Sequence, residues 1–117
     1  MLTSGGVSGK GAPLFDPLAR NDLRLDAIDA QTSPHSFAIS DSYYDHQDAD
    51  RDINCIFPLE RLRELAADHV IGEVASHHYS GFMGRTYIRS AVVNEAAPAL
   101  AARLRDESVD AFVLVPA

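Results

Sequence analysis

The sequence predicts one α/β domain over residues 1–117, built as a small, Rossmann-like parallel sheet in three layers. With 46% hydrophobic residues, a chain of this length can bury one hydrophobic core but not two. Short apolar runs alternate with two amphipathic helical patterns, an order typical of parallel strands joined by helices. The last apolar run lies at the end of the sequence, so we expect the sheet to be incomplete on that side.

Short apolar runs predict the strands, which are expected at residues 1–3, 37–39, 73–75 and 111–115. The run at 111–115 is uninterrupted, which is typical of a strand covered on both faces. Residues 16–30 fit neither the helical nor the strand period, so they are expected to be irregular or to hold a short strand.

Two helices are predicted from apolar residues at helical spacing. The first begins at Pro58, which suits a first turn, and its apolar stripe is formed by Leu59, Leu62, Leu65, Ala66 and Val70. The second has Pro98 in its first turn, and its stripe is formed by Ala96, Ala97, Leu100, Ala101 and Leu104. Residues 85–93 are expected to be a strand or a turn that leads into this second helix.

Three polar segments, at residues 4–11, 41–54 and 76–84, are predicted to be loops. Ligands of parallel α/β sheets bind beyond the carboxyl ends of the strands, so we expect the three loops to meet there. The first segment is rich in glycine but fits neither the Walker nor the dinucleotide-binding pattern, which favours a plain surface loop. The second holds five aspartates directly before a predicted helix, whose N-terminus favours anions.

The composition indicates which classes of partner and which cellular compartment to expect. The formal net charge is −7 and the ten Lys and Arg residues do not cluster, which argues against a nucleic-acid partner. No apolar run approaches the ~18 residues of a membrane span, so no membrane contact is expected. The single cysteine, Cys55, excludes an internal disulfide and favours a cytoplasmic protein. Its thiol is expected to pack as a small core residue.

Histidines and aspartates are the candidate chemical groups. His78 is the preferred acid–base residue, with an aspartate expected to orient its ring. Alternatively, His46, His77 and His78 could join an aspartate as transition-metal ligands, although adjacent strand residues point to opposite faces. The D-x-D-x-D run that ends at Asp52 is not an EF-hand, because Ile53 stands where glycine is needed. Another calcium or magnesium geometry stays open.

Three runs between residues 48 and 84 form a recognisable combination, namely DADRDINCIFPLERLREL, VIGEV and HYSGFMG. Together they resemble the selenoprotein B family of glycine, sarcosine, betaine and D-proline reductases, most closely its D-proline-reductase-like branch. The opening TSGGV and the closing AARLRDESVDAFVLVP are also similar to that family. The resemblance therefore covers most of the chain.

This resemblance implies a selenoprotein-B-like α/β domain, the N-terminal part of a reductase-like subunit or fragment. Such a subunit shapes a pocket in which a C–N bond of an amino acid or related amine is cleaved reductively. Electrons come from a thioredoxin-like or other dithiol donor through a selenocysteine or redox cysteine, and no other cofactor is indicated. The implied catalytic residues are His78 and Asp52, and the implied substrate-binding residues are Ser4, Gly5, Gly6, Asp45, Asn54, Tyr79 and Ser80.

In the family, the reactive selenocysteine or cysteine pair follows the strand that corresponds to residues 109–116. We therefore expect the thiol or selenol beyond Ala117 or on a partner, and a reading frame cut there at a UGA selenocysteine codon. The alternative is a shorter homologue that has lost the redox segment. A homo-oligomer or a companion reductase subunit is expected, because the predicted sheet has exposed edges. The alternative is a non-redox module that binds a small ligand or metal through His46, His78 and the Asp-rich loop.

Overall fold

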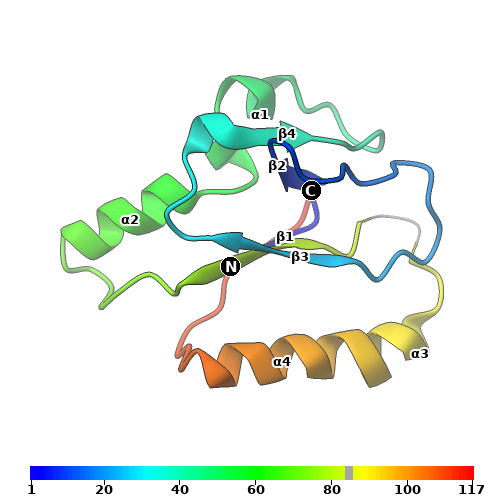
Figure 1. Ribbon diagram of the computed structural model, residues 1–117. Helices are drawn as coiled ribbons and strands as arrows, with labels where there is room; N and C mark the ends of the chain where they lie inside the picture. Colours follow the sequence, from blue (N-terminus) through cyan, green and yellow to red (C-terminus); the bar gives the residue numbers. More distant parts are fainter. Residues whose placement is uncertain (84–85) are drawn as a thin grey trace.

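A four-stranded sheet lies at the centre of the protein, with the strand order β3-β5-β1-β6 (Figure 1). In the computed structural model, which describes residues 1–83 and 86–117, the strands are β1 (Leu2–Thr3), β3 (Leu25–Asp29), β5 (His77–Gly81) and β6 (Leu114–Val115). β1 is parallel to both of its neighbours, β5 and β6, whereas β3 runs antiparallel to β5. The predicted α/β class is therefore confirmed.

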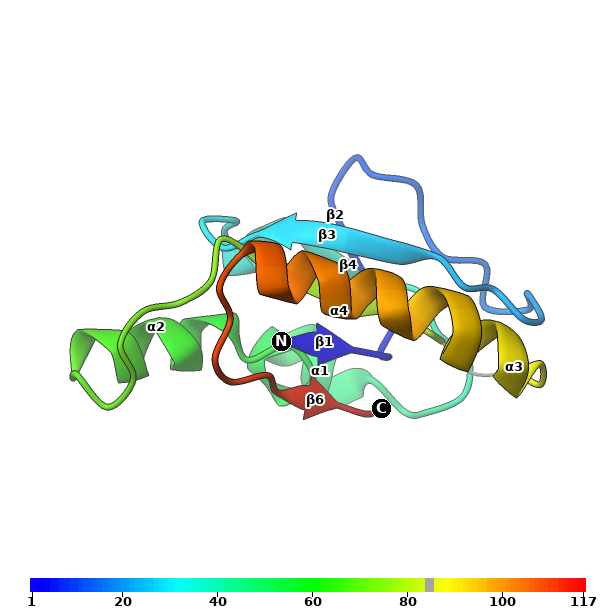
Figure 2. The same cartoon turned by 90° about the horizontal axis from the view of Figure 1, so that it is seen from below.

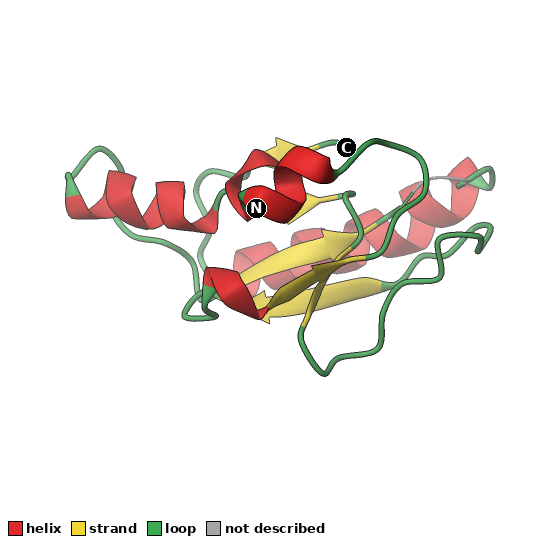
Figure 3. Ribbon diagram, turned by 90° about the horizontal axis from the view of Figure 1, so that it is seen from above, coloured by secondary structure: helices red, strands yellow, loops and turns green. Residues whose placement is uncertain are grey.

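A two-stranded antiparallel ribbon and a short helix lie over one face of this sheet (Figures 1 and 3). The elements on this side are β2 (Val7–Gly9), η1 (Pro34–Ser36), β4 (Phe37–Ile39), α1 (Gln47–Arg51), η2 (Ile53–Cys55) and α2 (Leu59–Ala67). The strand expected at 37–39 is confirmed. The loop expected at 4–11 is wrong in part, because Val7 and Ser8 are fully buried and pair with β4.

One long helical segment covers the opposite face of the sheet (Figures 1 and 2). It consists of α3 (Arg89–Ala91), the π-helical turn η3 (Val92–Ala96) and α4 (Ala97–Asp106). Pro98 lies in the first turn of α4, as expected, but α4 continues a helical segment that begins nine residues before Pro98. A proline inside a helix removes a backbone donor, and here the wide π turn, with Ala97 N donating to Val92 O, directly precedes it.

The strand expected at 73–75 is wrong, and the loop expected at 76–84 is wrong for residues 77–81. The strand is β5, which begins at His77 and has paired neighbours on both sides, β1 and β3. The backbone groups of this central strand are satisfied by pairing with both neighbours, whatever its side chains are. Several of its side chains are polar, so the strand lacks the apolar alternation that usually predicts one. Of the predicted loop, Gly84 lies outside the described residues, as does Arg85.

Two apolar stretches are more exposed than their patterns predict. In α2, Leu59 is buried in the core, whereas Leu65 is 39% exposed. Val70, which was expected on the same apolar stripe, lies beyond the end of α2 at Ala67 and is 68% exposed. β6 was expected to be covered on both faces, but it is an edge strand in which Leu114 is 63% exposed. Amphipathic periodicity reports which face is apolar, and it does not report whether another element covers that face.

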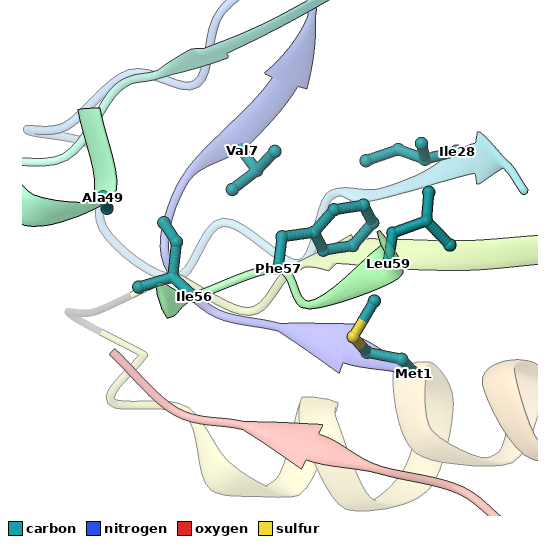
Figure 4. Packing of buried hydrophobic residues seen from close by; sticks show 7 residues of the cluster. All are labelled: Met1, Val7, Ile28, Ala49, Ile56, Phe57 and Leu59. Atoms are coloured by element: carbon teal, nitrogen blue, oxygen red, sulfur yellow. The ribbon is translucent and has the colours of Figure 1, made fainter. Parts of the chain in front are cut away.

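The main core lies between the sheet and the ribbon, with Phe57 at its centre (Figure 4). Its buried members are Met1, Val7, Ile28, Ala49, Ile56, Phe57 and Leu59. The Phe57 ring is fully buried and meets two other rings edge-on, Phe37 at 5.4 Å and His78 at 6.2 Å between centroids. A smaller cluster of Leu2, Tyr79 and Leu100 packs between the sheet and α4.

Candidate functional site

The turn Ser4–Gly5–Gly6 follows β1 at the edge of the sheet where the parallel strands end. The end of β6 lies against it, because the Ser4 hydroxyl accepts from Ala117 N at 3.1 Å and lies 3.3 Å from Ala117 O. This is the edge at which open α/β sheets bind ligands. The turn and the segment after β6 therefore form the first candidate site, which we name the carboxyl edge.

Both glycines of the turn are required by close neighbours. Gly6 has φ +64°, and a Cβ atom there would lie 2.4 Å from Ser40 O. A Cβ atom at Gly5 would lie 2.9 Å from Cδ1 of Ile56 and 3.1 Å from Oη of Tyr44. Glycine thus lets three chain segments approach one backbone turn, as happens where a backbone contacts a ligand or another segment closely.

Tyr44 connects the acidic segment to the carboxyl edge. Its phenol donates a hydrogen bond to Gly5 O at 2.9 Å. Burial, together with the carboxylates of Asp41 and Asp50, raises the pKa of Tyr44 to about 12, so the phenol stays a proton donor at neutral pH. The Tyr44 ring also meets the His46 ring edge-on at 5.9 Å, and Nδ1 of His46 lies 2.8 Å from Oδ2 of Asp50. A Tyr–His–Asp array therefore borders the carboxyl edge.

An open cleft of about 340 Å³ lies between α1 and β4. Its walls carry both charge signs beside apolar side chains, and they include Lys10, His35, Phe37, Ile39, Asp50, Arg51, Asp52, Ile53 and Glu60. Asn54 Nδ2 donates to Asp52 at 2.8 Å and to Glu60 at 2.9 Å. The hydrogen bonds from Asn54 lower the pKa of Asp52, so this exposed carboxylate stays ionised.

His78 is buried on the face of β5 that meets Phe57. Its Nδ1 lies 3.3 Å from the amino nitrogen of Met1, and among the described residues Nε2 has no hydrogen-bonding partner. Burial, aided by the positive charges of the Met1 amino group and Arg63, lowers its pKa to about 4. His78 is therefore neutral at physiological pH.

Tyr79 points to the other face of β5 and packs against α4. Its phenol donates to Oε1 of Glu107 at 3.2 Å, and the same oxygen lies 2.9 Å from Nδ1 of His77. Burial and the Glu107 carboxylate raise the pKa of Tyr79. These contacts tie the start of β5 to the end of α4.

The metal ligands considered from the sequence lie on different elements. His46 pairs with Asp50 beside α1, whereas His78 contacts Met1 inside the core. In the described part of the chain, no three His, Cys, Asp or Glu side chains are arranged to hold a metal ion.

The sequence model of the glycine/sarcosine/betaine reductase selenoprotein B family matches residues 1–117. The chain belongs to this family. One relative, the D-proline reductase subunit gamma of Acetoanaerobium sticklandii, is 32% identical over 114 residues, which is 97% of this chain and 46% of the relative. The glycine reductase complex component B subunit gamma of Carboxydothermus hydrogenoformans is 28% identical over 126 aligned positions, 97% of this chain and 26% of the relative. No solved structure matches the chain significantly.

This selenoprotein B family chain thus spans less than half the length of the curated relatives it matches. Both relatives are named as subunits of reductases. Among the described residues, no helix is long and apolar enough to cross a membrane.

The residues predicted to bind substrate fall into separate places in this family member. Ser4, Gly5 and Gly6 form the turn of the carboxyl edge. The buried Ser80 pairs across the sheet with Thr3, the residue directly before this turn. Asn54 is hydrogen-bonded to Asp52, which lines the cleft. Asp45 is exposed before α1, where it accepts from Gln47 N at 3.1 Å. Tyr79 lies on the α4 side of the sheet. Their substrate roles remain predictions.

The two predicted catalytic residues do not contact each other. Asp52 is on the surface and bonds Asn54, whereas His78 is in the core, and the structure shows the Met1 amino group beside its ring instead of the expected orienting aspartate. Cys55 was expected to pack in the core, and that expectation is wrong because its side chain is exposed at the end of η2.

The sequence did not predict the hydrogen bonds that Tyr44 and Glu107 form with distant parts of the chain. Tyr44 reaches a glycine 39 residues earlier in the chain, and Glu107 reaches a strand 28 to 30 residues earlier. No local period encodes such pairings. A tyrosine inside an aspartate-rich segment was the available signal for Tyr44, because a side chain with an apolar body and a polar tip suits a half-buried edge.

Acid is expected to destabilise the protein through His78. The folded-state pKa of about 4 lies below the ordinary 6.5, so the unfolded chain binds this proton first, and stability is lost as pH falls through that window. The expected contribution of His78 to this loss between about pH 7 and pH 5 is about 2 kcal/mol in the free energy of unfolding, measured by urea titration. Burial also lowers the pKa of the neighbouring Met1 amino group to about 6, so this group adds to the loss in the same range.

His78→Phe should flatten this pH dependence, since it removes the buried base and keeps a ring beside Phe57. The matched control is His69→Asn, because His69 is exposed with φ 58°, a backbone conformation that asparagine tolerates. An unchanged pH slope in His78→Phe would show that His78 does not cause the acid sensitivity.

Proposed function

We propose that this chain forms the pocket-shaping part of a selenoprotein-B-type reductase subunit that acts on an amino acid or related amine. The carboxyl edge is the proposed substrate site. The observation that carries this assignment is the convergence of the Ser4–Gly5–Gly6 turn, Tyr44 and the segment after β6 at the ligand-binding edge of the sheet. The family match over residues 1–117 supports the proposed reaction class.

The proposed reaction is the reductive cleavage of a C–N bond. A selenolate or thiolate attacks the carbon and displaces the amine, which leaves with a proton. A second thiol then attacks that sulfur or selenium, and the carbon leaves with its bonding electrons and takes up a proton. In total, two electrons and two protons are consumed, and a dithiol donor restores the resulting disulfide or selenenyl sulfide.

In this chain the carboxyl edge would bind and orient the substrate. The neutral Tyr44 phenol holds the Gly5 carbonyl, and the His46–Asp50 pair lies next to it as a group able to exchange protons with a leaving amine. The reactive selenol or thiol is proposed to come from a segment beyond Ala117 or from a companion subunit. Cys55, the chain's one cysteine, is exposed at η2 and has no second thiol to close a dithiol cycle.

Amide chemical shifts of the ¹⁵N-labelled chain test the location of the substrate site. Titration with D-proline, glycine, sarcosine or betaine at millimolar concentration is expected to shift the amides of Ser4, Gly5 and Gly6 most. With L-proline as the stereochemical control, smaller shifts are expected at the same amides. Addition of dithiothreitol to these mixtures is expected to give no turnover, because the redox residue is not on this chain; steady product formation would contradict that part.

Gly5→Ala sharpens the test, because its methyl group would crowd Ile56 and Tyr44 and narrow the turn. It is expected to weaken binding about tenfold, equivalent to about 1.4 kcal/mol. Gly9→Ala is the matched control, since a Cβ atom at Gly9 meets nothing within 4 Å. If none of the four amines shifts the turn, or if both variants bind alike, the substrate site does not lie at the carboxyl edge.

A further inference from the structure

The two edges of the central sheet differ in chemistry. The β3 edge carries Asp26 and Asp29, and charged side chains on an edge strand discourage the addition of another strand. At the other edge, no charged residue occurs from Ala111 to Ala117, and the exposed fractions of Val113 and Leu114 are 45% and 63%. The β6 edge therefore lacks the charge protection that the β3 edge has.

Backbone groups of β6 are available on the open side. Val113 O accepts from Leu2 N at 2.9 Å and Val115 O accepts from Ser4 N at 3.3 Å, so these carbonyls face β1. Because successive residues of a strand direct their backbone groups to opposite sides, the N–H and C=O of Leu114 face away from β1. Leu114 thus presents an apolar side chain together with an N–H and a C=O that have no hydrogen-bonding partner among residues 1–83 and 86–117.

The helical layer also stops short of β6. α4 packs on Leu2 and Tyr79 through Leu100, and the cluster that it forms does not include Leu114. Figure 2 shows α4 crossing in front of the sheet, with β6 uncovered beside it. Strands of parallel sheets are normally covered on both faces, so a second helix beside α4 would complete this layer.

We propose that the β6 edge binds the part of a selenoprotein-B-type subunit that this chain does not span, as one strand parallel to β6 with a helix beside α4. The length comparison favours this binding partner. The match covers 46% of the D-proline reductase subunit gamma, so the remaining 54% lies outside it. A parallel strand and its crossover helix would pair with Leu114 and bury the exposed face of β6.

This proposal rests on the proposed function, because the occupant is taken from the same reductase family. The experiments can contradict the proposed substrate site and the proposed β6 interface independently of each other. Association without any amine-induced shift at Ser4–Gly5–Gly6 overturns the substrate site alone, whereas amine binding without association overturns the β6 interface alone.

The test is co-expression of this chain with the part of the Acetoanaerobium sticklandii D-proline reductase subunit gamma that lies outside the matched region, carrying an affinity tag. The wild-type chain is expected to co-purify as a 1:1 complex by light scattering, with slowed hydrogen exchange at the Leu114 amide. Leu114→Asp is expected to weaken association at least thirtyfold without unfolding the chain, because this side chain is largely solvent-exposed. Circular dichroism checks the fold of the variant.

Val70→Asp is the matched control, since Val70 is 68% exposed in the turn that follows α2. It should change the affinity less than threefold. Three results would overturn the proposal: no co-purification of the wild-type chain, equal effects of the two aspartate variants, or a homodimer of this chain that Leu114→Asp dissociates. The last would identify a second copy as the occupant of the edge.

Discussion

Replacement of Phe57 by alanine is expected to lower the free energy of unfolding by about 4 kcal/mol, a large part of the stability of a domain of this size. The ring is fully buried and forms edge contacts with Phe37 on the ribbon and His78 on the sheet. Its removal would leave a cavity between two layers that are each anchored by paired strands, so the surroundings cannot close onto it easily. Urea unfolding followed by circular dichroism measures the loss.

Val70→Ala is the control for this substitution, because it also removes apolar atoms but from an exposed position. A change within about 0.5 kcal/mol is expected for it. If Phe57→Ala cost no more than Val70→Ala, the ribbon and the sheet would not share the core that Figure 4 shows.

Gly81→Ala is expected to destabilise the protein by about 3 kcal/mol or more. Gly81 pairs with Leu25, and a Cβ atom at Gly81 would lie 2.3 Å from Arg24 O and 3.0 Å from Leu25 Cα. Both are backbone atoms, so the clash can be relieved only by moving β3 away from β5. Equilibrium unfolding and amide exchange across β3 report the cost and its location.

Gly9→Ala provides the comparison in a second strand, where the added methyl group meets open space. It is expected to be neutral or slightly stabilising, because alanine restricts the unfolded chain more than glycine does. Equal destabilisation by the two variants would mean that general strand propensity, and not the contact with Arg24, determines the effect.

Periodicity predicted the elements whose apolar residues decide their burial. The start of the helix after Pro58 and the strand at 37–39 are both correct, because Leu59 and Phe37 have to leave water. β5 was missed since its residues His77–Gly81 are polar or small, and their place at the sheet centre depends on pairing with β1 and β3. Pairing with a distant strand produces no pattern in the local sequence.

The candidate site was predictable only in its glycine turn. Ser4–Gly5–Gly6 stood out because glycine pairs permit close approaches, and the structure shows such approaches at both positions. The expectation that His78 meets an aspartate came from its residue type, but its position is determined by the alternation of β5, which turns it toward the core. Side-chain chemistry alone therefore did not locate this residue.

The central position of β1 has a consequence for synthesis of the chain. Leu2 pairs with Tyr79 on one side and with Leu114 on the other, so both neighbours of this strand are translated long after it. Contacts between residues so far apart in the sequence cost loop-closure entropy before packing stabilises them. Such contacts therefore slow folding. During synthesis, the β1 segment stays unpaired until β5 has been made, and its second edge stays unpaired until β6 has been made. In that interval its apolar residues are exposed to chaperones and to other nascent chains.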